Sequence, residues 1–180
     1  MILSPSELLP LISQGLVIKG LSQRELISPE GAGFDLCVAS ISEISGPGSL
    51  LIETRHTSSI TPVTPVNDNE TNGVLTLKPN GLYLLTTAEQ FALPDDMVAI
   101  FHPRSTLFRS GVIFQSGVAP YGYEGPMTFL VYIANPHGFR LQLGARFAHV
   151  NIASVKGSSF AYRGQWQNGR ITVTEDERQK

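Results

Sequence analysis

Short apolar segments separated by turn residues are the feature that most constrains the fold of this chain. The 180 residues include 17 glycines and 12 prolines, which are spread along the sequence rather than gathered into a linker. Between these turns lie segments of four to eight apolar or β-branched residues, which is typical of β-strands. They cover residues 49–53, 74–78, 82–87, 97–102, 112–115, 127–134, 146–155 and 171–174. This spacing predicts a mainly β fold, arranged as a sandwich or a barrel.

The beginning of the chain carries the only helix signal. Ser4 is a suitable N-cap, Pro5 suits the first helical position, and Glu7 completes a capping box. Apolar residues follow at helical spacing until Gly15, which is expected to end the helix. We therefore predict one short N-terminal helix.

Composition and charge limit the classes of function. Hydrophobic residues make up 42% of the chain and charged residues 16%, which indicates a globular protein, and the length fits one domain spanning 1–180. The net charge of −2 provides no general positive field, so we expect binding neither to nucleic acid nor to an anionic membrane. A polyanionic ligand must therefore meet a local cluster of cations.

The single cysteine and the absence of a targeting signal indicate a location. Cys37 has no partner for an intramolecular disulfide and lies in an apolar stretch, where a buried thiol is expected. The sequence shows neither a positively charged leader nor about 18 consecutive apolar residues. We predict a cytoplasmic protein that is not exported and does not span a membrane.

Three segments have unusual patterns. Residues 54–72 are polar and show little periodicity, which predicts a long surface excursion. Residues 157–180 form a polar tail that contains aromatic residues and arginines, and it either orders over a ligand or packs on a neighbour. The strand at 127–134 is apolar on both faces, which predicts burial on both sides and is compatible with packing against another subunit.

The segment around residues 103–111 is the most informative for chemistry. Arg104 and Arg109 flank the hydroxyl residues Ser105 and Thr106. Guanidinium groups together with hydroxyl and backbone donors can bind a chain of phosphates. In the alternative interpretation, Arg104 pairs with a core carboxylate and Ser105 caps a helical turn. The spacing alone favours neither interpretation.

Five segments, in order, resemble sequence motifs of the dUTPase and dCTP deaminase superfamily. They are residues 31–36 (GAGFDL), 103–107 (PRSTL) with Gly111, 117–125 (GVAPYGYEG), 144–149 (GARFAH) and 162–167 (YRGQWQ). The resemblance covers nearly the whole chain. It implies a distorted jelly roll, of the β-clip or dUTPase-like type, and a homotrimer whose sites form between subunits. It also implies hydrolysis of dUTP to dUMP and pyrophosphate, assisted by Mg²⁺, through attack of water on the α-phosphate.

The resemblance assigns roles to particular residues. It places Arg104, Ser105, Thr106, Arg109 and Gln167 at the phosphates, and Gly117, Val118 and Tyr123 at the nucleoside. It places Asp35 near the magnesium, although a carboxylate alone in an apolar strand also suits a structural partner of Arg104 or Arg146. Tyr123 would lie under the deoxyribose, or else pack on a strand as an ordinary hairpin residue.

Both acids that such enzymes use are replaced in this chain. Pro120 stands where the hydrolases carry the Asp that activates water, and Leu130 stands where the deaminases carry a Glu. Glu124 and Asp35 are the remaining candidates for a catalytic acid. Two alternatives to a dUTP hydrolase therefore stay open, a non-catalytic nucleotide-binding homologue and a dCTP deaminase.

Overall fold

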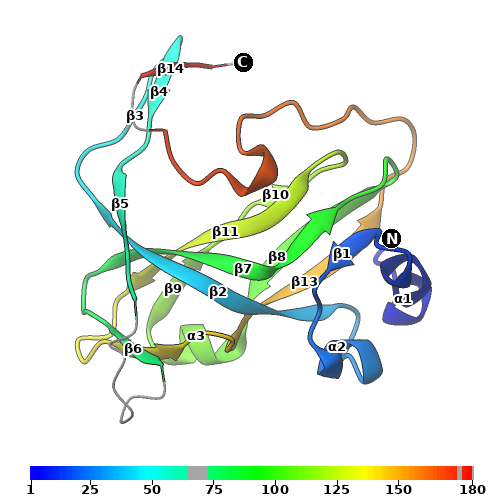
Figure 1. Ribbon diagram of the computed structural model, residues 1–180, viewed down its shortest axis with the longest axis horizontal. Helices are drawn as coiled ribbons and strands as arrows, with labels where there is room; N and C mark the ends of the chain where they lie inside the picture. The colour runs from blue at the N-terminus through cyan, green and yellow to red at the C-terminus, as the bar shows by residue number, and fades with distance from the viewer. Residues whose placement is uncertain (65–72, 174–175, 180) are drawn as a thin grey trace.

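The computed structural model describes residues 1–64, 73–173 and 176–179. Its main element is an antiparallel sheet in the order β10-β8-β13-β2-β7-β11-β9, with β1 and β5 paired to β7 and β2 (Figure 1). The strands of this sheet are β1 (Val17–Lys19), β2 (Phe34–Ser45), β5 (Ser59–Pro62), β7 (Leu82–Ala92), β8 (Met97–Pro103), β9 (Val112–Gln115), β10 (Val118–Ala119), β11 (Glu124–Ile133) and β13 (Arg146–Ser154). Two smaller sheets pair β6 (Val74–Leu77) with β12 (Phe139–Gln142), and β3 (Ser49–Leu50) with β4 (Thr54–His56) and β14 (Glu177–Arg178).

The long strand β2 makes the sheet curl. Its first part pairs with β13, where Cys37 lies opposite Arg146, and its second part pairs with β7, where Val38 lies opposite Thr87. Both ladders contain a register shift near this change of partner, and such bulges bend a strand and increase its twist. The curled antiparallel sheet confirms the prediction of a mainly β fold.

Aromatic side chains fill the inside of the curled sheet. The ring of Phe101 lies 5.3 Å from that of Phe91 and 5.0 Å from that of Phe129, and Phe114 lies 5.1 Å from Phe129. Such edge-on and tilted contacts stabilise a core by about 0.5–1.5 kcal/mol per pair beyond the burial of area. The strands that carry the candidate site are therefore held on a closely packed base.

The predicted N-terminal helix is present as α1 (Pro5–Ser13). The backbone N–H of Ser4 donates to Glu7 Oε2 at 2.9 Å, and Leu8 and Ile12 are buried. Gly15 follows the helix with a φ of +77°, which glycine adopts without strain.

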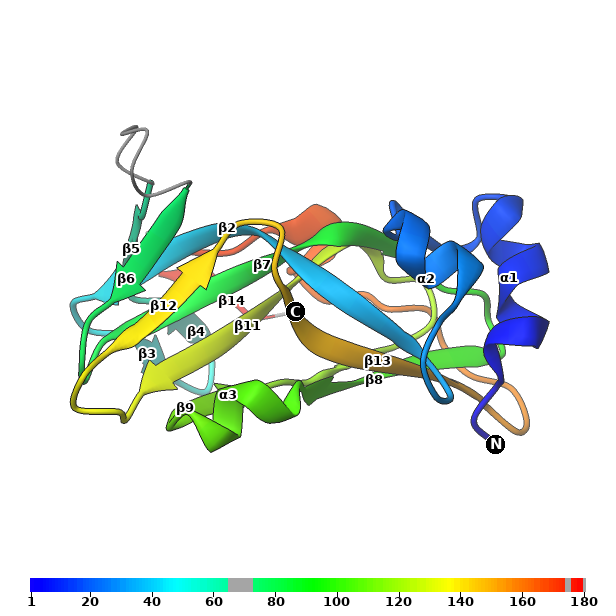
Figure 2. The ribbon, with the colours of Figure 1, turned by 90° about the horizontal axis from the view of Figure 1, so that it is seen from below.

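The prediction that this is the only helix is wrong. The structure also contains α2 (Gln23–Ile27), α3 (Ser105–Arg109) and a 3₁₀ turn, η1 (Gln167–Gly169). These elements are too short to produce an apolar period in the sequence. Figures 1 and 2 show α1 and α2 together at one end of the sheet, while α3 lies beside β9.

The expected strands are largely observed, with three corrections. The strand expected at 49–53 ends at Leu50, and residues 171–173 are not in a strand. The excursion at 54–72 contains β4 and β5, whereas its residues 65–72 lie outside the described part. The polar residues of β5 are compatible with a strand because β5 pairs only with β2 and lies at a sheet edge, whereas β4 is the middle strand of the small sheet between β14 and β3.

The strand predicted at 127–134 is β11, but within one chain its two faces differ. Phe129, Val131 and Ile133 are buried in the core, whereas Thr128 and Leu130 on the other face are half-buried.

In the described part of the chain, no helix is long and apolar enough to cross a membrane. The cytoplasmic location stays a prediction.

Candidate functional site

A cavity of about 500 Å³ lies on the face of β7 and β11 that points away from the phenylalanine core. Leu84 and Leu130 line it, and they alternate along their strands with the core residues Leu85 and Phe129. The predicted nucleoside-binding residues Gly117, Val118 and Tyr123 also line this cavity. The structure therefore brings these three residues together, and we call this space the hairpin cavity.

Tyr123 is held rigidly at the edge of the hairpin cavity. Its hydroxyl donates to the carbonyl oxygen of Pro126 at 2.5 Å, and its ring packs edge-on against Tyr162 at 5.6 Å. Burial raises the pKa of the Tyr123 phenol to about 12, so the group is protonated at neutral pH. Tyr123 therefore packs as a hairpin residue and also lines the cavity, and its position under the deoxyribose stays a prediction.

The C-terminal tail covers the hairpin cavity. Tyr162, Trp166 and Arg170 line it, and Figure 1 shows the orange and red tail running beside the β10–β11 end of the sheet. Gln167 joins tail to hairpin, because its Nε2 donates to Gly122 O at 2.7 Å and its Oε1 accepts the Glu124 N–H at 3.1 Å. The amide predicted to bind phosphate is thus bonded to the hairpin backbone of its own chain.

Among the residues that the structure describes, no Asp, Glu or His lines the hairpin cavity. Pro120 and Leu130, which stand at the two expected acid positions, both line it. Arg170 is the only charged residue in this described lining. Glu124, a candidate acid, is exposed and does not line this space. The described lining therefore offers no carboxylate or imidazole as a proton acceptor.

A second cavity, of about 380 Å³, lies at the end of β8. Asp35, Arg104, Ser105 and His149 line it, together with Glu30, His102 and Pro103. Ser105 is exposed at the first position of α3, directly after Arg104. We call this space the phosphate cleft, after the residues predicted to bind phosphate.

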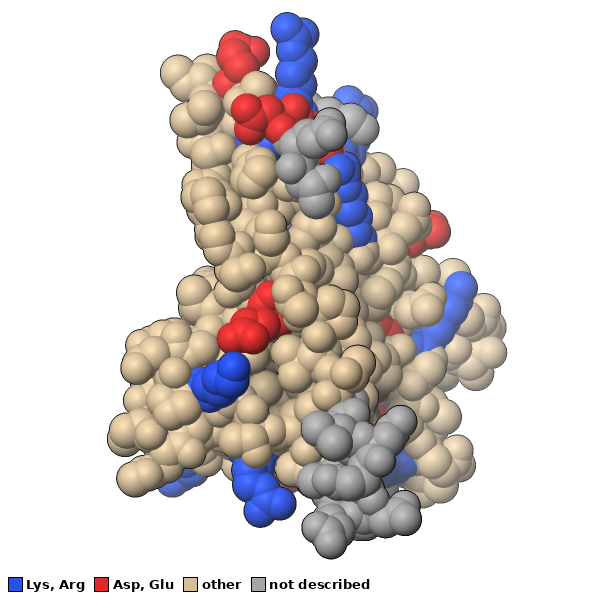
Figure 3. All heavy atoms as spheres, turned by 60° about the vertical axis from the view of Figure 1, so that its left-hand side comes forward, with Lys and Arg blue, Asp and Glu red and all other residues tan. Residues whose placement is uncertain are grey.

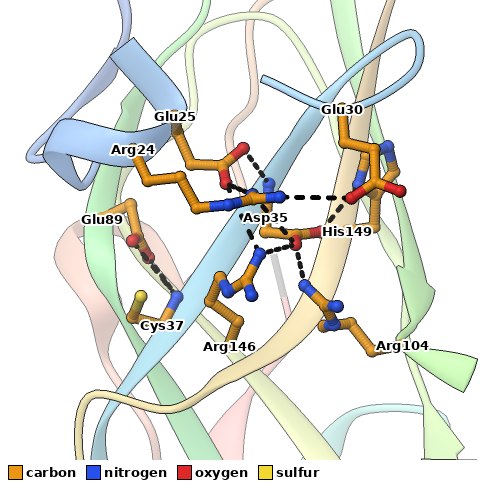
Figure 4. A network of polar contacts seen from close by, with 9 residues as sticks. All are labelled: Arg24, Glu25, Glu30, Asp35, Cys37, Glu89, Arg104, Arg146 and His149. Carbon is orange, nitrogen blue, oxygen red and sulfur yellow. Dashed lines mark hydrogen bonds and ion pairs between the residues drawn. The ribbon is translucent and has the colours of Figure 1, made fainter. Parts of the chain in front are cut away.

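Cations converge on Asp35 in the phosphate cleft (Figure 4). Its Oδ2 accepts hydrogen bonds from Arg104 and from Nη1 of Arg146, the latter at 2.9 Å, and Nη1 of Arg24 lies 3.8 Å away. The Asp35 side chain is only 8% exposed, so this charge requires partners. The structure therefore realises the structural interpretation of Asp35, with both arginines as partners.

Two further carboxylates balance these arginines. Glu25 of α2 is completely buried, accepts the backbone N–H of Asp35 at 3.0 Å, and bonds Arg24. The exposed Glu30 accepts a hydrogen bond from Arg24 Nη2 at 3.2 Å. The α2 helix thus supplies one cation and one anion to the cleft, which the sequence analysis did not foresee.

His149 is the functional candidate that sequence reasoning missed. Its Nδ1 lies 3.0 Å from Asp35 Oδ1, and the two residues are register partners on β13 and β2. Burial is the main cause that lowers the pKa of the imidazole, and the Arg104 charge adds to it, against Glu25 and Glu30. The only sequence signal was the polar position of His149 opposite Asp35, which requires knowledge of the strand pairing.

The remaining predicted phosphate residues lie elsewhere. Thr106 lines a neighbouring cavity with Arg104 and Arg146, and so stays near the cleft. Arg109 is exposed at the end of α3, where its guanidinium lies 5.8 Å from the ring centre of Phe108. Arg109 is therefore not brought to the phosphate cleft within this chain.

The donor set does not fit a magnesium ion held by the protein. Within residues 1–64, 73–173 and 176–179, no group of three or more His, Cys, Asp or Glu could hold a metal. Asp35, predicted to lie near the magnesium, directs its oxygens to cations. Mg²⁺ often binds mainly through substrate phosphates, and we derive no step through it here.

The hairpin cavity and the phosphate cleft are separate within one chain. They share none of their described lining residues. Figure 3 shows one face of the molecule on which charged side chains are scattered among uncharged ones, in keeping with the absence of a general positive field.

Comparison with known proteins agrees with the motifs. The family model described as dCTP deaminase-like matches residues 2–155. The chain is 33% identical over 154 residues to a probable deoxyuridine 5'-triphosphate nucleotidohydrolase of Aeropyrum pernix, covering 84% of this chain and 90% of that protein. It is 35% identical over 94 residues to a dCTP deaminase of Pyrobaculum islandicum, covering 52% of this chain and 53% of that protein.

Solved structures share the fold. The dCTP deaminase from Agrobacterium tumefaciens matches with a TM-score of 0.64 and 16% identity over 84% of this chain, which corresponds to 46% of that longer chain. The EIAV dUTPase matches with a TM-score of 0.51 and 17% identity over 86% of this chain and 98% of that one. The prediction of a dUTPase-like jelly roll is confirmed.

Proposed function

The chain belongs to the dCTP deaminase-like family, and from this premise we propose that it binds a pyrimidine deoxynucleoside triphosphate and hydrolyses dUTP to dUMP and pyrophosphate. The relative from Aeropyrum pernix, which matches most of the chain, is named a probable dUTP nucleotidohydrolase, and this name supports the choice of dUTP.

The crowding of cations at Arg104 is the observation that carries the proposal. The pKa of Arg104 is lowered by burial and by the nearby charges of Arg146 and Arg24. The charged form of such a group is stabilised when an anion binds next to it, because the anion offsets the repulsion between the cations. Phosphate oxygens suit a guanidinium especially well, since they accept two parallel hydrogen bonds.

The separation of the two cavities supports a homotrimer with shared sites. In our proposal, the hairpin cavity of one subunit holds the nucleoside, and Arg104 and Ser105 of another subunit hold the phosphates. This arrangement uses the predicted residues that line the two cavities, namely Gly117, Val118 and Tyr123 in one and Arg104 and Ser105 in the other.

Hydrolysis would proceed by attack of water on the α-phosphorus. The new bond forms between the water oxygen and phosphorus, and the bond to the bridging oxygen breaks so that pyrophosphate leaves. Arg104 and Ser105 would donate hydrogen bonds to phosphate oxygens as charge develops on them, which is the largest contribution expected in such a reaction. Any bound Mg²⁺ would neutralise part of the triphosphate charge.

A non-catalytic nucleotide-binding protein is the second candidate. The specific observation in its favour is the hairpin cavity, in which the described lining includes Pro120 and Leu130 and no acid. This candidate predicts nucleotide binding without turnover. The same observation argues against deamination of dCTP, which needs proton transfer at the base.

One assay separates these possibilities. The protein is incubated with Mg²⁺ and dUTP, dCTP or dTTP, and pyrophosphate and ammonia are measured separately. Pyrophosphate from dUTP supports the hydrolase, ammonia from dCTP indicates a deaminase, and binding without either product supports the second candidate.

Arg104→Ala tests the phosphate assignment. We expect dUTP binding to weaken by about 10- to 150-fold, which corresponds to 1.5–3 kcal/mol for a charged hydrogen-bonding group. Arg163→Ala, at an exposed position of the tail, is the control for loss of one positive charge. Equal weakening by both variants would contradict a specific role for Arg104.

A further inference from the structure

The proposed hydrolysis needs a group that accepts a proton from water, and the hairpin cavity has none among its described residues. The phosphate cleft, in contrast, contains Asp35, Glu30, His102 and His149. Asp35 is bonded to Arg104 and Arg146, so its negative charge is already shared between cations. A histidine in the same space is a better proton acceptor near neutral pH.

The contact with Asp35 fixes the tautomer of His149. An ionised carboxylate only accepts hydrogen bonds, so at 3.0 Å from Asp35 Oδ1 the Nδ1 atom of His149 carries the proton. In the neutral ring Nε2 then has a free lone pair. This arrangement, with the imidazole oriented by a carboxylate through Nδ1, is the one that prepares a histidine for general base catalysis.

The opposite edge of the ring lies beside Gly33. A Cβ at this position would be 2.7 Å from His149 Nε2 and 2.0 Å from the carbonyl oxygen of Val150, so only glycine fits. Asn151 donates to the carbonyl oxygen of Ala32 at 2.8 Å and anchors this segment to β13. Gly33 is buried, and because it has no side chain, only its backbone lies against Nε2 on this side.

Several charged groups surround the imidazole. Asp35 on β2, Glu30 before β2 and Glu25 on α2 are the acidic ones. Arg104 after β8 is the basic group whose charge acts on the imidazole. His102 is the register partner of His149 on β8 and lines the same cleft. His149 itself is 25% exposed on its side chain, which is sufficient for contact with a water molecule in the cleft.

We propose that His149, oriented by Asp35, is the general base that activates water in this protein. The inference rests on the proposed function. As the water oxygen bonds to the α-phosphorus, its proton moves to His149 Nε2, and the bond between the α-phosphorus and the oxygen leading to the β-phosphate breaks. Pyrophosphate leaves with that oxygen, and the imidazolium then returns its proton to solvent. Asp35 acts as a positioning residue.

The test compares His149→Gln and His149→Ala with the control His137→Gln, at an exposed position that lines neither cavity. Each variant replaces one histidine, and of these two positions only His149 lines the phosphate cleft and contacts Asp35. Pyrophosphate release from dUTP is measured with Mg²⁺, and dUTP affinity and thermal melting confirm that each variant is folded and binds. We expect kcat to fall by about 10²–10⁴-fold in both His149 variants, with little change in dUTP affinity and nearly normal turnover in His137→Gln.

Two further readouts distinguish a base from a structural residue. Added imidazole should restore part of the turnover of His149→Ala, because it can occupy the vacated space and accept the proton. The rise of kcat/KM with pH in the wild type should disappear in His149→Gln. A purely structural contact with Asp35 would change neither readout in this way.

Three results would overturn the inference. They are a wild-type kcat in His149→Gln, failure of imidazole to restore any turnover to folded His149→Ala, and equal losses of kcat in His137→Gln and His149→Gln. A wild-type protein that binds dUTP and releases no pyrophosphate would instead refute the proposed hydrolysis itself. The failure of the inference and the failure of the function are therefore distinguishable.

Discussion

The charge cluster around Asp35 allows a quantitative prediction for Asp35→Asn. The substitution keeps the shape of the side chain and removes the negative charge to which Arg104, Arg146 and His149 are bonded. Each hydrogen bond to a charged group is worth about 1.5–3 kcal/mol. The partner side chains are 29%, 33% and 25% exposed, so they regain some water when the charge is lost.

We therefore expect the free energy of unfolding to fall by about 2–4 kcal/mol, less than three full bonds and more than an exposed ion pair. For a chain of this size, this corresponds to a loss of roughly 4–16 °C in Tm. Urea unfolding followed by far-UV circular dichroism measures the change, and Asp96→Asn, at an exposed position, is the control.

An anion should partly replace the missing carboxylate. Pyrophosphate is expected to raise the Tm of Asp35→Asn more than that of the wild type, because it binds the folded state only and meets unpaired guanidinium groups. A loss below about 1 kcal/mol, or equal stabilisation of both proteins by pyrophosphate, would refute the view that Asp35 holds this cation cluster together.

Three more predictions concern other parts of the fold. Burial raises the pKa of Glu89, so its ionisation costs stability. Glu89→Gln should therefore gain stability relative to wild type as the pH rises from the ordinary carboxyl pKa toward the raised one, with no further gain above it, and urea unfolding between pH 4 and pH 8 measures this trend. Cys37 is half-buried rather than buried as the sequence predicts, and burial is the main cause that raises the pKa of its thiol to about 11. Its labelling by a thiol reagent at pH 8 should therefore be much slower in the folded than in the urea-unfolded protein. Gly125 has a φ of +116°, and a Cβ there would lie 2.8 Å from Gly169 N. Gly125→Ala should therefore release the tail and speed its proteolysis. Gly46 also has a positive φ but has free space around it, so Gly46→Ala should only lower the stability of the protein.

Local sequence patterns were sufficient to predict the N-terminal helix and most of the long strands. The capping box at Ser4 and Glu7 predicted α1 because the residues that bond each other lie within one turn. The apolar runs predicted most of the long strands for the same reason. The helix α2 was missed because five residues cannot establish a helical period. The helical turn considered at Ser105 is present as α3, but Arg104 and not Ser105 is its N-cap residue.

The candidate site was predictable only in part because its contacts join distant strands. Arg104 and Ser105 were recognised from a short motif, and the structure places both at one cleft. His149 meets Asp35 across 114 positions of sequence, and Arg24 reaches the same carboxylate from a helix that shows no local signal. Only the pairing of β13 with β2 brings these groups together.

Residues 120 and 130 lack the expected acids, and His149 contacts Asp35. These two observations fit together if His149 has taken over as the proton acceptor. With Pro120 and Leu130 in its lining, the hairpin cavity offers apolar surface for the faces of the nucleobase and the sugar. Water that attacks an α-phosphate must instead approach from the side of the phosphates, and on that side the chain provides a neutral imidazole beside Arg104. In this arrangement, one cavity recognises the nucleoside and the other supplies both charge stabilisation and proton transfer. Loss of the acids would therefore leave the hydrolysis intact while removing any chemistry at the base.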